Sequence, residues 1–75
     1  MSKLPTIRAR DLVRAAERAG FVFDRQRGSH AVYYRESDRR RIVVPVHAGQ
    51  DMKPGTLRAI ITDMGLTVDE FIALL

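Results

Sequence analysis

The sequence predicts an α+β domain with a three-stranded antiparallel sheet and helices on one face. Two changes in the spacing of apolar residues carry this prediction. Spacing typical of an amphipathic helix runs from about Arg8 to Ala19, alternation typical of strands runs from Phe21 to Val46, and helical spacing returns after Pro54. The predicted strands are joined by short turns, which indicates an antiparallel meander. We expect residues 1–75 to form a single domain, because this length suffices for only one small core.

The first predicted helix spans residues 8–19. Its apolar residues recur at helical spacing and its charged residues lie on the opposite side. The apolar set is Leu12, Val13, Ala15, Ala16 and Ala19, and the charged set is Arg10, Arg14, Glu17 and Arg18. Gly20 follows, and glycine readily adopts the left-handed conformation that ends many helices.

Three strands are predicted after Gly20. In the first, Phe21 and Phe23 alternate with Val22 and Asp24. The third is rich in β-branched residues, which is typical of a strand. The second strand is predicted over Ser29–Arg35 and the third over Arg41–Val46, with turns at Arg27-Gly28 and Glu36–Arg39. Pro45 has no N–H to donate, so the third strand should lie at the edge of the sheet or end there. The arginines at 39–41 are predicted to form a solvated entrance to that strand, with contact to phosphate as the alternative.

The predicted turns determine which residues face one another. The expected pairs are Phe21–Tyr34, Phe23–Val32, Arg25–His30, Val32–Val44, Tyr34–Ile42 and His30–Val46. Opposed residues share a face. One apolar layer should therefore contain Phe21, Phe23, Val32, Tyr34, Ile42, Val44 and Val46. Tyr33 should lie on the other face, where its ring is free to stack on a nucleic-acid base.

The segment KPGTLRAIITDMGL predicts a second helix that begins at Pro54, a residue suited to the first helical position. Its apolar stripe, which ends before Gly65, consists of Leu57, Ile60, Ile61 and Met64. A capping box of Thr67 with Glu70, together with a hydrophobic staple of Leu66 with Phe71, predicts the start of a short last helix.

The composition narrows the classes of function. The formal net charge is +4, the isoelectric point is about 10.3, and eleven of the thirteen cations are arginine. Arginine matches phosphate with a planar set of donors, so the chain is a candidate nucleic-acid binder. The lack of cysteine excludes disulfides and is typical of a reducing cytoplasm. No signal-peptide pattern or membrane-spanning run is present in the sequence, and we expect no contact with membranes.

Several polar groups are predicted to meet at one end of the sheet. His30 ends the apolar layer beside Arg25, and His47 follows the third strand. Lys53 precedes the second helix, whose N-terminal amides form a natural site for phosphate. A histidine after a turn is also a common hydrogen-bonded edge residue, so catalysis by His30 and a purely structural role both remain open at this point.

The chain resembles the HicA toxins of bacterial type II toxin–antitoxin modules. The likeness extends from about Leu4 to Leu75 and rests on four pieces in order: AGFVFDRQRGSHAVY, VVPVH, KPGTLRAII and GLTVDEF. The resemblance implies a fold like the double-stranded-RNA-binding domain, cleavage of mRNA that arrests growth, and neutralisation by a HicB antitoxin. The family's catalytic histidine belongs to a Gly-Ser-His motif, which corresponds to Gly28, Ser29 and His30.

These considerations predict a bacterial, cytoplasmic endoribonuclease that needs no metal or other cofactor. His30 is the expected general base, because histidine exchanges protons near neutral pH. The expected RNA contacts are Arg25, Arg27, Gly28, Ser29 and Lys53, and His47 is a possible second proton carrier. The expected partners are mRNA and a HicB-type antitoxin, with no small-molecule ligand. One alternative is a non-catalytic RNA-binding module that blocks translation by occupancy, and another is a protein whose basic face only docks an acidic partner.

Overall fold

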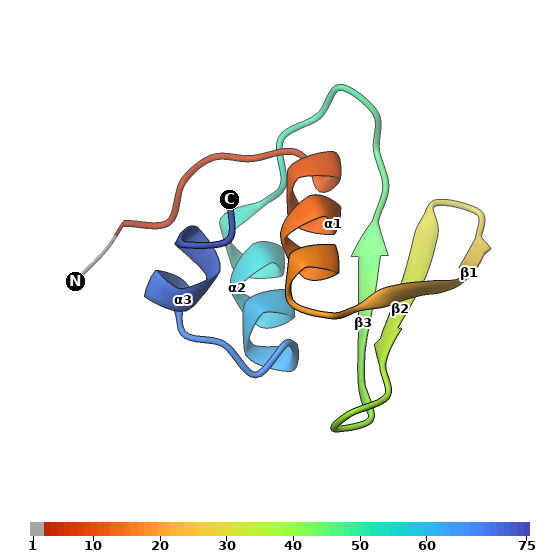
Figure 1. Cartoon of the computed structure of the whole chain (residues 1–75). Coiled ribbons are helices and arrows are strands. Elements are labelled where there is room, and N and C mark those ends of the chain that lie inside the picture. Colours follow the sequence, from red (N-terminus) through yellow and green to blue (C-terminus); the bar gives the residue numbers. More distant parts are fainter. Residues whose placement is uncertain (1–2) are drawn as a thin grey trace.

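A computed structural model describes residues 3–75 and is shown in Figure 1. The elements are α1 (Ala9–Arg18), β1 (Val22–Arg27), β2 (His30–Arg35), β3 (Arg40–Pro45), α2 (Pro54–Asp63) and α3 (Val68–Ile72). The sheet is antiparallel with β2 at its centre, and the helices lie to one side of it (Figure 1). The predicted α+β fold, which is consistent with the double-stranded-RNA-binding-domain-like arrangement, is confirmed. β3 is an edge strand and ends at Pro45, as the sequence predicts.

The core lies between the helices and the face of the sheet that they cover. Both predicted helical stripes are buried there, since Leu12 and Met64 are fully inaccessible and Leu57 is 1% exposed. Phe71 of α3 closes the far side of this core. The predicted capping box at α3 is confirmed: the Glu70 N–H donates to the Thr67 hydroxyl (3.1 Å), and the Thr67 N–H donates to the Glu70 carboxylate (2.9 Å).

The first hairpin turns at Gly28-Ser29, so the predicted turn at Arg27-Gly28 is wrong by one residue. Gly28 has a φ of +56°, and a positive φ at the first central residue is typical of two-residue turns that match the twist of paired strands. Arg27 therefore pairs with His30, and Arg25 pairs with Val32 instead of His30. The register shifts again between Phe23 and Arg25, where β1 contains a bulge.

In the second hairpin the predicted turn at Glu36–Arg39 is confirmed, but the expected strand pairing is wrong by one residue. Arg39 adopts a φ of +56°, which closes the turn at four residues, and Arg40 becomes the first residue of β3. His30 consequently pairs with Pro45 and not Val46, while Tyr33 pairs with Ile42. Because side chains alternate along a strand, a slip of one residue exchanges the two faces.

The predicted apolar layer is therefore partly wrong. Phe21, Ile42 and Val44 are buried as expected. Ala31 and Tyr33 occupy the core positions that were predicted for Val32 and Tyr34, which face away from the helices. Phe23 is 55% exposed, with its ring packed edge-on against Tyr33 at a centroid distance of 5.7 Å. Val46 is half-buried against the core.

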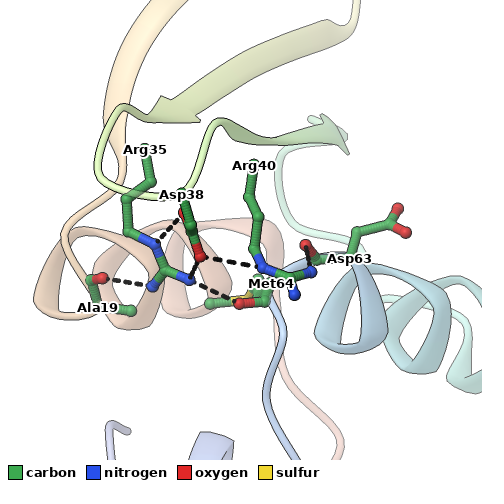
Figure 2. Close-up of polar contacts among 6 residues, drawn as sticks. All are labelled: Ala19, Arg35, Asp38, Arg40, Asp63 and Met64. Atoms are coloured by element: carbon green, nitrogen blue, oxygen red, sulfur yellow. Dashed lines mark hydrogen bonds and ion pairs between the residues drawn. The ribbon is translucent and has the colours of Figure 1, made fainter.

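An arginine–aspartate network fixes the β2–β3 turn to the helices (Figure 2). The Arg35 guanidinium donates twice to the Asp38 carboxylate, at 3.0 and 2.8 Å. It also donates to the carbonyls of Ala19 (2.8 Å) and Met64 (3.0 Å), at the C-terminal ends of α1 and α2. Helix ends leave carbonyls without intrahelical partners. Arg35 thus satisfies two such carbonyls and holds both helices at this end of the sheet.

Arg40 extends the same network. Its Nε donates to Asp38 at 3.0 Å and its Nη1 donates to the Asp63 carbonyl at 3.3 Å. Arg39, Arg40 and Arg41 are all exposed at the entrance to β3, as predicted, but Arg40 also makes these structural contacts. The hydrogen bond from Arg35 is the main cause that lowers the pKa of Asp38 to about 2. The network lies at the Arg35–Arg40 end of the sheet, whereas His30 lies at the opposite end of β2.

Candidate functional site

His30 is the first residue of β2 and follows the Gly28-Ser29 turn. Its side chain is exposed, and its cross-strand neighbours are Arg27 on β1 and Pro45 on β3. Directly opposed residues share a face, so the imidazole lies on the side of the sheet that faces away from the helices. The histidine is accessible to a large ligand and has a cation across the strand from it.

Two hydrogen bonds to backbone carbonyls hold the turn that precedes His30. The side-chain amide of Gln26 donates to the Gly28 carbonyl at 3.0 Å, and the Val46 N–H donates to the Ser29 carbonyl at 2.6 Å. A Cβ at Gly28 would meet no atom within 4 Å. Glycine is favoured there by its positive φ and not by crowding, which leaves the tip of the turn open to an incoming backbone.

The two predicted arginine contacts differ in their surroundings. Arg25 binds the neighbouring Asp24 carboxylate at 2.8 Å, with both side chains substantially exposed. Exposed pairs of this kind contribute little and are readily exchanged for another anion. Arg27 has no ion-pair partner within residues 3–75 and lies directly opposite His30. Arg27 is therefore the better placed of the two cations.

Lys53 and His47 belong to a second cluster at the start of α2. Lys53 is the N-cap residue, and Pro54 occupies the first turn. A surface hollow is lined there by Pro45, His47, Gln50, Asp51, Lys53 and Thr56, among others. The loop that forms it is held to the chain before α1, because the Met52 N–H donates to the Ile7 carbonyl at 2.8 Å. The structure thus groups His47 with Lys53, as the sequence predicts.

Pro45 connects the two clusters. It pairs with His30 across the sheet and also lines the hollow with His47 and Lys53. His30 is not among the residues that line the hollow. The predicted single rim is better described as two neighbouring groups, His30 with Arg27 and His47 with Lys53, on either side of Pro45.

Sequence reasoning misplaced the tyrosines. Tyr33, predicted to be free for stacking, is 8% exposed in the core, and its burial raises the pKa of its hydroxyl. Tyr34 is half-buried on the same face as His30, opposite Arg41. Tyr34 was assigned to the core because its face depends on the turn at Arg39, and an arginine gives no sequence signal of the left-handed conformation that Arg39 adopts.

Residues 3–75 contain no group of three or more histidine, cysteine, aspartate or glutamate side chains arranged to hold a metal ion. No helix in the same range has the length and apolar character needed to cross a membrane.

A comparison with protein-family models matches residues 9–66 to the HicA toxin of bacterial toxin–antitoxin systems. The matched range begins with α1 and ends just after α2, so it includes the whole sheet and both clusters around Pro45. A search of curated proteins finds no match to this chain.

Proposed function

The chain belongs to the HicA family of bacterial toxins, and from this premise we propose that it is an endoribonuclease that cleaves mRNA with His30 as general base. A toxin of such a module has a cognate antitoxin, and we assign this role to a HicB-type protein. The observation that carries the proposal is the exposure of His30 beside Arg27, at an open turn formed by Gly28 and Ser29.

The reaction follows from what RNA itself supplies. A ring nitrogen of His30 takes the proton of a ribose 2′-hydroxyl, and the freed oxygen forms a bond to the adjacent phosphorus. The bond from phosphorus to the 5′-oxygen breaks, and that oxygen takes up a proton. The products are a 2′,3′-cyclic phosphate and a 5′-hydroxyl. Proton transfer of this kind contributes about 10²–10⁴-fold to the rate.

Neighbouring groups supply charge and orientation. Arg27 is placed to contact the phosphate that carries the developing charge, and Arg25 becomes available when it leaves Asp24. The exposed backbone of Gly28 lets the RNA approach the imidazole. Lys53, at the positive end of α2, would hold a neighbouring phosphate. His47 lies two residues beyond Pro45, the partner of His30, and is the candidate donor to the leaving oxygen.

The decisive experiment is cleavage of RNA by the purified chain in excess EDTA. A histidine base acting on the 2′-hydroxyl requires no divalent ion, so we expect full activity and products that end in 2′,3′-cyclic or 3′-phosphate. A substrate with 2′-deoxyribose at the cleavage position is the matched control and should resist cleavage. Activity that disappears in EDTA and returns with Mg²⁺ would contradict the histidine mechanism. Binding without cleavage would support the alternative of translational block by occupancy.

A further inference from the structure

The face of the sheet that the helices leave uncovered has an unusual charge pattern. The strand register places nine residues on it, namely Val22, Arg25, Arg27, His30, Val32, Tyr34, Arg41, Val43 and Pro45. We call this set the open face. Its strand-paired positions hold three arginines and no carboxylate, although the whole chain has nine acidic residues, and the Asp24 carboxylate reaches the face from the bulge. Asp24, at the bulge, pairs with Arg25, whereas Arg27 and Arg41 have no ion-pair partner within residues 3–75. The open face is therefore complementary to a polyanion.

The middle of the open face is apolar. Val32 is 8% exposed at its centre, while Val22 and Val43 on the outer strands are 62% and 45% exposed. Tyr34 lies between Val22 and Arg41, and its side chain is only half-buried. Exposed apolar side chains flanked by arginines, on a face that no helix covers, are typical of a binding surface and not of a solvated sheet. An extended ligand with anionic groups could pair with the arginines of this face, and its flat apolar groups could pack on the apolar side chains.

The candidate catalytic residue and the aromatic residue lie on one line. His30, Val32 and Tyr34 are alternate residues of β2 and share the open face, while Figure 1 shows the helices on the other side of the sheet. Four residues of strand span about 13 Å, so a chain bound at His30 would reach Tyr34 within a few nucleotides. Aromatic rings on a sheet recognise bases only when those bases are unpaired. A duplex hides its base faces and does not fit this arrangement.

We propose that single-stranded RNA lies along the open face, with the cleaved phosphate at His30, an unpaired base on Tyr34, and flanking phosphates at Arg27 and Arg41. The position of the cleaved phosphate rests on the proposed function, whereas the binding track rests on charge and register alone. The fold resembles a double-stranded-RNA-binding domain, yet the substrate of this surface is a single strand.

The test uses a fluorescently labelled eight-nucleotide 2′-O-methyl RNA, free and annealed to its complement, with affinity measured by anisotropy over a range of salt concentrations. We expect the single strand to bind more tightly than the duplex. Tyr34→Leu, which keeps apolar bulk but removes the ring, should weaken single-strand binding about fivefold or more. Arg41→Ala should reduce the slope of log affinity against log salt by about 0.7. Arg58→Ala removes an exposed arginine from α2, on the other side of the sheet, and should change neither quantity.

Two results would overturn the proposal. If Arg58→Ala and Arg41→Ala reduced RNA affinity equally, the RNA would not be confined to the open face. Unchanged RNA affinity in both open-face variants would also refute it, and a loss of antitoxin binding in the same variants would assign the face to a protein partner. If thermal melting shows that Tyr34→Leu is unfolded, the RNA affinity of Arg41→Ala and its dependence on salt serve as the test. Because the probe has no free 2′-hydroxyl, binding is scored independently of cleavage, and cleavage by the wild type and by His30→Ala decides the proposed function separately.

Discussion

His30 is an exposed residue at the end of a strand, where its side chain contributes little to the packing of the core. Its side chain fills no cavity, and the hydrogen bonds that hold the preceding turn come from Gln26 and from the backbone of Val46. Tyr33, three residues later, is buried in the core. Removing the imidazole should therefore affect reactivity much more than folding.

The first prediction at the residue scale concerns His30→Ala. We expect the free energy of unfolding to fall by about 1 kcal/mol or less. His30 lies outside the hydrophobic core, caps no helix and takes no part in a buried hydrogen-bond network. RNA cleavage should fall by about 10² or more, the scale of a lost proton transfer. Thermal melting and cleavage are to be measured on one preparation. In cells the variant should accumulate without toxicity.

His30→Asn serves as the matched variant, because asparagine keeps a polar side chain but exchanges no proton near neutral pH. It should be as inactive as the alanine variant. A folded His30→Ala protein that cleaves at the wild-type rate would end the catalytic assignment and make His47 the next residue to test. A variant that stays toxic without cleavage would instead indicate translational block by occupancy.

At the scale of elements, the β2–β3 turn acts as a clamp on two helices. Asp38 orients Arg35 and Arg40, which in turn bind carbonyls at the ends of α1 and α2 (Figure 2). The Arg35 guanidinium also lies 4.5 Å from the centre of the buried Phe21 ring. Loss of the Asp38 charge should therefore loosen contacts between the sheet and both helices, far from His30.

We predict that Asp38→Asn lowers the melting temperature at neutral pH and leaves RNA cleavage at moderate temperature unchanged. The pKa of Asp38 is lowered from 3.8 to about 2 in the folded chain, mainly by the hydrogen bond from Arg35. Because the pKa of this carboxyl group is lower in the folded than in the unfolded chain, its ionised form stabilises the fold at pH values above about 4. This stabilisation is lost as the pH falls from about 4 to 2. The difference in melting temperature between wild type and variant should shrink over that range.

Glu36→Gln is the control, since it removes a carboxylate from the same turn, and that side chain has no ion-pair partner among residues 3–75. Its effect on melting should be small at every pH. If both variants lower the melting temperature equally, the effect reflects the net charge of the turn, and the clamp is refuted.

At the scale of the whole molecule, arginines of the same sheet have two different kinds of surroundings. Arg35 and Arg40 stabilise the fold, while Arg27 and Arg41 lie on the open face without partners in the described part of the chain. A toxin of this family must be held inactive by its antitoxin. Covering His30 is the simplest means, and the partner surface should then be acidic where it meets Arg27 and Lys53.

The prediction is that the antitoxin associates rapidly at low salt and more slowly as salt rises, because charge complementarity acts mainly on the association rate. Arg27→Ala should reduce both the rate and its dependence on salt, as measured by stopped-flow mixing, whereas Arg58→Ala should leave both unchanged. A structure of the complex in which His30 stays open to solvent would require an indirect mode of inhibition.

The sequence by itself determined the order of elements, the helical stripes and the ends of the helices. These features follow from local rules: apolar spacing buries Leu12 and Leu57, Pro54 begins α2, and Thr67 with Glu70 caps α3. The sequence also identified the Gly28-Ser29-His30 motif and the grouping of His47 with Lys53, while the roles of these residues stay predictions.

Only the tertiary structure decided which face each strand residue occupies. Side chains alternate with a period of two, so one residue in the Arg39 turn and one bulge beside Phe23 exchange whole sets of side chains between core and surface. Tyr33 and Tyr34 are adjacent and identical in chemistry, and nothing local distinguishes them. Their environments differ because Arg40, held by Asp38 and the end of α2, joins the strand and sets the register.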